Sequence, residues 1–122
     1  MSLVRRWSRD VAGAFAVEFA VVAPAFMALL FGVLQGGMTL WTQFALQQAT
    51  ERAARCASVN TSVCGSPTLT QAYAATQTLG RNLPSNSFTV TTQACGSFVS
   101  GAYAVQLLTY SVELKAQSCL PK

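Results

Sequence analysis

Residues 13–40 read GAFAVEFAVVAPAFMALLFGVLQGGMTL, and Glu18 is the only ionisable side chain among them. A helix of roughly 27 residues rises about 40 Å at ~1.5 Å per residue, which is enough to cross a bilayer. A helix in a globular core needs no apolar run of this length. The whole chain is 52% apolar and 10% charged, a composition unusual for a soluble protein. We therefore predict a transmembrane helix over residues 14–40.

The charges around this apolar run predict its orientation. Arg5, Arg6 and Arg9 precede it, whereas the first basic residue that follows is Arg52. Because basic residues near a span favour the cytoplasmic side, residues 1–13 are expected in the cytoplasm and the rest of the chain outside. The sequence thus predicts a single-pass inner-membrane protein with a periplasmic or extracellular C-terminal domain.

Glu18 is an unusual residue for a simple membrane anchor. A charged side chain deep in hydrocarbon costs about 2.5–3.5 kcal/mol, whereas one Leu or Phe returns only ~0.3–0.6 kcal/mol on the same scale. An ionisable residue in such a position is by default a functional hypothesis. The less specific alternative is that Glu18 lies near the headgroups and reaches water, since five residues of helix are only ~7.5 Å deep.

The residues before Glu18 predict a cleavage site. A secretory signal peptide has an apolar core of about 7–15 residues, and this run is about twice as long. If a peptidase instead cut between Gly13 and Ala14, Glu18 would be the fifth residue of the new chain. The freed α-amine, with a reference pKa of ~7.7–8.0, would be cationic. Pairing with the Glu18 of a neighbouring subunit would offset the desolvation of both charges and set the axial register.

The stretch GAFAVEFAVVAPAFMALLFG resembles the N-terminal motif of the TadE-like minor pilins, or pseudopilins, of tight-adherence (Flp-type) pili. The resemblance spans roughly residues 12–37 of this chain. It is carried by the following residues: Glu18, Phe19, Pro24, Phe31 and Gly32. Beyond residue 60 the sequence shows no comparable motif.

The resemblance implies a function in the assembly of a type IV-like pilus. Prepilin peptidase would remove residues 1–13 by cutting between Gly13 and Ala14, and Glu18 with Phe19 would register the subunit in the assembly. The implied role is that of a minor pilin that contributes to initiation, priming or the tip of the pilus and hence to surface attachment. The implied partners are the prepilin peptidase, the major Flp-type pilin, other minor pilins, the inner-membrane assembly platform and membrane lipid.

Small residues and a proline within the span predict helix packing. Gly32 and Gly36 have the G-x-x-x-G spacing that allows two membrane helices to approach closely. Pro24 removes a backbone donor and favours a kink, although proline is common in membrane helices generally. Because Pro24 also matches the position in the family motif, we expect a role in packing for all three residues.

Residues 41–58 are predicted to continue the helix with two different faces. The predicted apolar face consists of Leu40, Trp41, Phe44, Ala45, Ala49, Ala53, Cys56 and Ala57. The predicted polar face consists of Thr42, Gln43, Gln47, Gln48, Glu51, Arg52 and Arg55. This segment is therefore expected to leave the membrane and to pack on the domain that follows.

All four cysteines follow the predicted span, where an oxidising periplasm allows disulfides. Four cysteines permit three pairings, and the sequence alone does not select one. We favour Cys56 with Cys64 and Cys95 with Cys119, because these pairs close two separate local loops. A metal site is the weaker alternative, since the chain has no histidine and no C-x-x-C pair.

Residues 59–122 are predicted to form a small α+β domain. Ser66-Pro67 is typical of a helix start, and Gly80 of its end. The residues predicted to be buried in this helix and directly after it are Leu69, Ala72, Tyr73, Thr76, Leu79 and Leu83. The fold class is thus a long N-terminal helix, a short helix and an antiparallel hairpin or sheet.

The strands are predicted from β-branched residues and from alternation. Residues 88–95 (FTVTTQAC) form the first strand, and residues 96–101, which begin and end with glycine, supply a turn. Apolar residues then alternate up to Leu107 and resume in the opposite phase at Leu108. Such a phase slip predicts a β-bulge or a change of strand.

The composition argues against several classes of function. Without histidine and with few carboxylates, general acid–base and triad chemistry lack their usual groups, so we expect no enzyme and no cofactor. No basic run or basic-aromatic patch indicates a nucleic-acid partner. The alternative to a minor pilin is a membrane-anchored periplasmic binding or adhesion module that does not polymerise.

Overall fold

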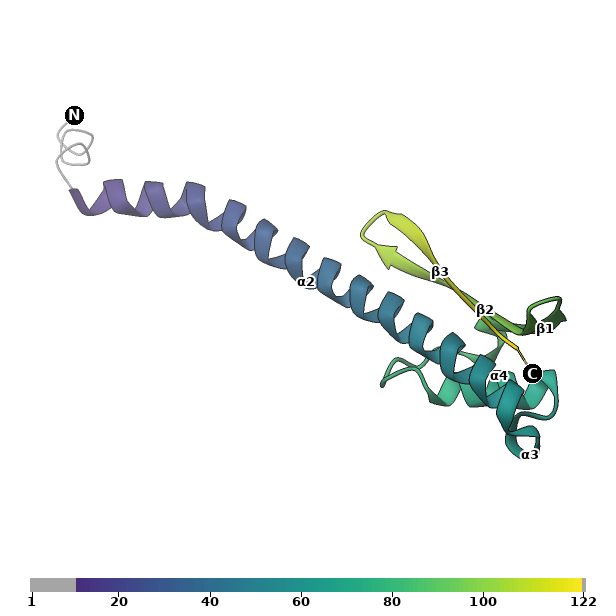
Figure 1. Cartoon of the computed structure of the whole chain (residues 1–122). Coiled ribbons are helices and arrows are strands. Elements are labelled where there is room, and N and C mark those ends of the chain that lie inside the picture. Colours follow the sequence, from purple (N-terminus) through teal and green to yellow (C-terminus); the bar gives the residue numbers. More distant parts are fainter. Residues whose placement is uncertain (1–10, 122) are drawn as a thin grey trace. The chain divides into compact units, whose positions relative to one another are not determined.

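The structure, a computed structural model, describes residues 11–121, with side chains described from Gly13 onward. The arginines that predicted the orientation, and most of the predicted leader, lie outside this range. The chain divides into two compact units between Gly37 and Met38, here called unit 1 and unit 2. The division falls within one helix, α2 (Val11–Val59), so each unit contains part of it (Figure 1).

Unit 2 contains the second part of α2, two short helices and a three-stranded antiparallel sheet. The further elements are α3 (Thr61–Cys64), α4 (Pro67–Thr76), the 3-10 turn η1 (Ser85–Ser87), β1 (Phe88–Gln93), β2 (Gly96–Leu107) and β3 (Tyr110–Leu120). The strand order is β1-β2-β3, with β2 in the centre. The predicted α+β class, with a long N-terminal helix, is confirmed.

The phase slip at Leu107-Leu108 is a change of strand. Leu107 pairs with Tyr110 across a two-residue turn, and Leu108 in that turn has φ 51°. Residues other than glycine rarely adopt this left-handed backbone angle, and a residue branched at Cβ would be more strained there than leucine, whose branch is at Cγ. The change in phase follows because residues 107 and 110 must face the same side of the sheet.

The turn predicted at residues 96–101 is wrong, because these residues begin β2. The actual turn is Ala94-Cys95, since Gln93 pairs with Gly96. Gly101 is glycine because of packing: a Cβ there would lie 2.9 Å from Leu46 Cδ1 and 3.2 Å from Phe88 Cδ1. The glycine therefore allows α2 and β1 to approach β2, and it does not mark a loop.

The core of unit 2 lies between the sheet, α2 and α4. Its buried members are Leu46, Ala49, Ala53, Ala54, Ala74, Leu83, Phe88, Val99, Leu114 and Ala116. Four of them are alanines of α2 and α4, and their small side chains let these helices pack closely on their neighbours. Leu46, Phe88 and Val99 supply the largest fully buried apolar side chains.

The predicted apolar face of residues 41–58 is wrong in part. Ala45, Ala49 and Ala53 are buried as expected, but Trp41 and Phe44 are 53% and 55% exposed. The buried face instead includes two threonines and one further leucine, namely Thr42, Thr50 and Leu46. Both threonines are satisfied within the helix: the Thr42 hydroxyl donates to Met38 O at 2.8 Å and the Thr50 hydroxyl to Gln47 O at 2.8 Å.

Helix α4 starts where predicted, but its predicted buried face is right only in part: Leu83, which follows the helix, is buried and Tyr73 packs against the core. Ser66 caps it by accepting from the Leu69 N–H at 3.3 Å, and Pro67 is its first residue. The buried residues are Thr70 and Ala74, whereas Leu69 is 51% exposed. The Thr70 hydroxyl donates to Ser66 O at 3.0 Å, so its burial leaves no unpaired donor. The helix ends at Thr76, before the predicted Gly80.

Two disulfides hold unit 2, in the pairing that the sequence favoured. Cys56 is bonded to Cys64, which ties the end of α2 to α3. Cys95 is bonded to Cys119, which ties the β1–β2 turn to the end of β3. Neither bridge involves unit 1, so the covalent constraints are confined to the unit that has a core.

Candidate membrane-anchoring and assembly site

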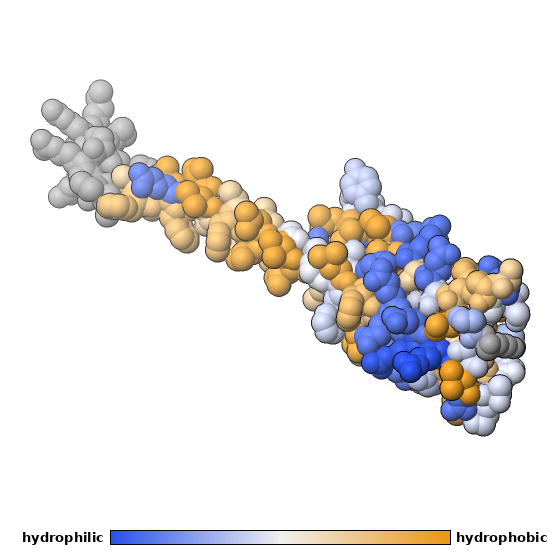
Figure 2. Space-filling view, in the orientation of Figure 1, coloured by the Kyte–Doolittle hydropathy of each residue, from blue (hydrophilic) through white to orange (hydrophobic). Residues whose placement is uncertain are grey.

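The described part of unit 1 is a helix whose apolar side chains are not buried by the chain. The stretch Gly13–Val59 of α2 is long and apolar enough to cross a membrane, and its most apolar window has no buried residue. Phe15, Phe19 and Val21 are 69%, 74% and 71% exposed. Figure 2 shows this segment as an almost continuous apolar surface. One long apolar helix of this kind is suited to anchoring the protein in a membrane.

The helix passes Pro24 without a break. Proline has no N–H, so the carbonyl of Ala20 lacks its usual donor one turn later. In a membrane such a carbonyl is satisfied by local adjustment or by a neighbouring group, which is one reason that proline is tolerated there. Pro24 therefore places an available acceptor within an apolar helix.

Glu18 is the only ionisable side chain between Gly13 and Thr50, and it is exposed on the helix. Residues four apart lie on one face, so Ala14 and Glu18 are separated by about 6 Å along the axis. Phe19, on the adjacent face, is also exposed. Glu18 thus presents one carboxylate, one turn from the proposed new N-terminus, on an otherwise apolar surface.

The glycines of unit 1 have no role in its own packing. A Cβ added at Gly13, Gly32 or Gly36 would meet nothing within 4 Å. The fold of the single chain therefore does not require glycine at these positions. Any need for a small residue at these positions would have to come from outside the chain.

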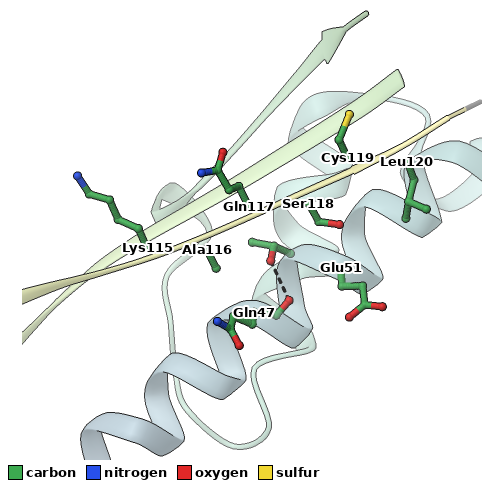
Figure 3. A pocket seen from close by; sticks show the side chains of 9 residues that line it. Gln47, Glu51, Lys115, Ala116, Gln117, Ser118, Cys119 and Leu120 are labelled. Carbon is green, nitrogen blue, oxygen red and sulfur yellow. Dashed lines mark hydrogen bonds between the residues drawn. The ribbon is translucent and has the colours of Figure 1, made fainter. Parts of the chain in front are cut away.

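Unit 2 has an open groove between α2 and β3 (Figure 3). Its volume is about 540 Å³, and Gln47, Glu51, Lys115 and Gln117 are among the lining residues. The Glu113–Lys115 ion pair nearby, at 3.0 Å, is largely exposed and contributes little to stability. Within residues 13–121 no three His, Cys, Asp or Glu side chains form a group suited to a metal ion. The groove is therefore an open surface feature of mixed polarity.

The fold and the exposed helix define a class of small protein in which one apolar N-terminal helix precedes a disulfide-bonded α+β unit. Residues 13–55 match the family model described as TadE-like protein. The resemblance expected from the sequence is confirmed over this segment. The match continues past Gly37 into the part of α2 that packs on the sheet. Neither the curated proteins nor the solved structures searched contain a match to this chain.

The sequence predicts Trp41 at the outer membrane interface, but it assigns no exposed surface to Met38, Leu108 or Tyr110. Met38, Trp41, Leu108 and Tyr110 are each more than half exposed. The alternation of apolar residues predicts Tyr110 on the same side of the last strand as Val112 and Leu114. The sequence does contain a signal for this apolar surface: no charged residue occurs between Arg81 and Glu113.

Proposed function

We propose that this protein is a minor pilin, or pseudopilin, that helps to initiate, prime or cap a tight-adherence pilus. In this proposal α2 crosses the inner membrane once, with residues 1–13 in the cytoplasm and unit 2 on the periplasmic side. Prepilin peptidase removes the leader after Gly13. The processed chain then joins the major Flp-type pilin and other minor pilins at the inner-membrane assembly platform. The subunit has no catalytic role of its own.

The observation that carries the proposal is Glu18, a lone carboxylate exposed on an apolar helix within the segment that matches the TadE-like model. In hydrocarbon the carboxylate is unfavourable unless a cation accompanies it. Cleavage after Gly13 creates such a cation at Ala14. Pairing between the amine of one subunit and Glu18 of the next satisfies both charges and fixes one axial offset between the helices.

The first test is the N-terminus of the mature protein, measured by mass spectrometry on membranes or on pili. We expect a chain that begins at Ala14. Gly13→Ala should block this processing, whereas the matched Gly32→Ala should be processed normally, because neither glycine has a packing contact in the chain. An intact Met1, or cleavage near Gly37, would contradict the minor-pilin proposal and leave an anchored protein.

The second test is assembly. Glu18→Ala should insert into the membrane as well as the parent or better, because it removes a charge from an apolar segment. The same variant should fail to enter pili, whereas Glu51→Gln, an exposed carboxylate of unit 2, should enter them normally. Incorporation of the Glu18 variant at the parental level, measured by immunoblotting of sheared pili, would discard the registry mechanism.

A second candidate function is a membrane-anchored binding or adhesion module that does not polymerise. It is favoured by one observation: the family match ends at residue 55, so α4 and the sheet lie outside it. The same two measurements separate the candidates. A module keeps its function with an uncleaved leader and with Glu18→Ala, whereas a minor pilin does not.

A further inference from the structure

The apolar face of the β2–β3 hairpin extends beyond the core that covers it. On the side that faces the core, Val99 is 0% and Leu114 is 8% exposed. Further along the same side of β3, Val112 is 40% and Tyr110 is 76% exposed, and Leu108 in the turn is 85% exposed. The alternation of apolar residues continues, but no described residue of unit 2 covers the end of the hairpin.

The tip of the hairpin lies at the end of unit 2 that begins with Met38. Gln43 Nε2 donates to Lys115 O at 2.9 Å, and further along the groove Glu51 lies beside the residues near Leu120 (Figure 3). Helix α2 and strand β3 therefore run in the same direction within this unit. The start of β3, and with it the turn, must project toward Met38 (Figure 1).

The hairpin tip and the part of α2 that begins unit 2 carry no charge, and the nearest charges on β3 are the paired Glu113 and Lys115. Charged side chains are absent from residues 19–50 of α2 and from residues 82–112, which include the hairpin tip. The exposed apolar residues here are Met38, Leu40, Trp41, Phe44, Leu108, Tyr110 and Val112. Figure 2 shows apolar surface at the end of the unit where α2 enters it, and hydrophilic surface further along.

We propose that the hairpin tip, defined as Leu108, Thr109 and Tyr110, is a second lipid contact that inserts at the boundary between headgroups and acyl chains. Lipid fits better than a polar partner because this surface is continuous along the chain with the apolar part of α2. Trp41 and Tyr110 combine an apolar ring with a polar edge, the side chains enriched at membrane interfaces. The contact holds unit 2 against the membrane surface. The proposal rests on the membrane anchoring of α2 but not on cleavage or polymerisation.

The test uses tryptophan fluorescence of the full chain in phospholipid vesicles. Trp7→Phe and Trp41→Phe first remove the native tryptophans, and a single new tryptophan is then introduced by Leu108→Trp. The matched control is Thr91→Trp, an exposed position near the other end of the sheet. We expect Leu108→Trp to show a blue-shifted emission and to be quenched by phospholipids brominated in the acyl chain. Thr91→Trp should show neither effect.

The outcomes distinguish a lipid contact of the hairpin tip from membrane anchoring by α2 alone. If the chain floats with the vesicles but Leu108→Trp emits as in water and is not quenched, α2 anchors the protein and the lipid contact is wrong. The proposal is also overturned if the emission of Leu108→Trp is not quenched but shifts further to the blue as the protein concentration rises. That result would assign the hairpin tip to contact with a second copy of the chain. Should Leu108→Trp fail to form both disulfides, as judged by mass under non-reducing conditions, Thr109→Trp replaces it with the same expectation.

Discussion

Unit 2 buries several large apolar side chains within its own fold, whereas the described part of unit 1 buries none. Leu46, Phe88 and Val99 in unit 2 are at most 1% exposed, while Phe15 and Phe19 in unit 1 are 69% and 74% exposed. An apolar surface of that extent is not tolerated in water and marks a membrane or protein contact. The fold of unit 2 therefore depends on its own sequence, and the environment of unit 1 must come from outside the chain.

The two units also use their small residues differently. The alanines of α2 in unit 2, such as Ala49 and Ala53, are buried against the sheet. The glycines of unit 1 meet nothing in the chain. Substitutions should therefore divide into those that change the stability of unit 2 and those that change only association.

The largest effect on stability is expected from Leu46→Ala. Leu46 is fully buried, so its truncation leaves a cavity and should lower the free energy of unfolding by about 4 kcal/mol. Denaturant unfolding in detergent, followed by near-UV circular dichroism, would measure this. Leu34→Ala in unit 1, where the leucine is 60% exposed, should leave the unfolding of unit 2 unchanged. Equal losses from the two variants would refute the separation of the units.

The next largest loss of stability is expected from removal of the Cys95–Cys119 disulfide. Its sequence separation of 24 corresponds to about 3.5 kcal/mol of loop-closure free energy, against about 2.5 kcal/mol for the separation of 8 between Cys56 and Cys64. Paired Cys→Ser variants, compared by the same denaturant unfolding, should show this order. If loss of the shorter bridge destabilised unit 2 more, the loop-entropy account would not hold here.

A smaller effect is expected from Gly101→Ala. The new methyl group would lie 2.9 Å from Leu46 Cδ1, and both Leu46 and Phe88 are buried and have little freedom to move. Overpacking of this kind should cost about 1–2 kcal/mol. Gly80→Ala serves as a contrast in the same unit, because φ there is +79° and no atom lies within 4 Å, so any cost arises from the backbone alone. A stabilised Gly101→Ala variant would show that α2 and β2 have room between them.

The sequence was sufficient to predict the fold class and the long helix, and it restricted Leu107-Leu108 to a β-bulge or a change of strand. These features depend on local signals: an apolar run, turn residues and a shift of alternation. The lone carboxylate at Glu18 was equally visible, because a charge in an apolar run needs no structural context to be recognised. Glu18 also lies within the segment that carries the family resemblance.

The buried faces of α2 and α4 were not predictable by the same reasoning. Thr42, Thr50 and Thr70 were counted as polar or given no place in the core, yet all three are buried. Each hydroxyl donates to a carbonyl three or four residues earlier, which removes the penalty for burial. A pattern of apolar residues does not show this internal pairing, so the predicted faces were rotated about the helix axis.

The smallest effect on the stability of unit 2 is expected from Gly36→Ala. A Cβ at this position meets nothing within 4 Å, so the denaturant unfolding of unit 2 should stay within about 0.5 kcal/mol of the parent. The same change should weaken contact between α2 helices, because the methyl group fills the face that Gly32 and Gly36 share. Energy transfer between labelled chains in detergent would report this. Gly37→Ala is the matched control: it is equally free of contacts but lies on a different face of the helix. If both variants associated like the parent, the face that Gly32 and Gly36 share would not be a packing surface.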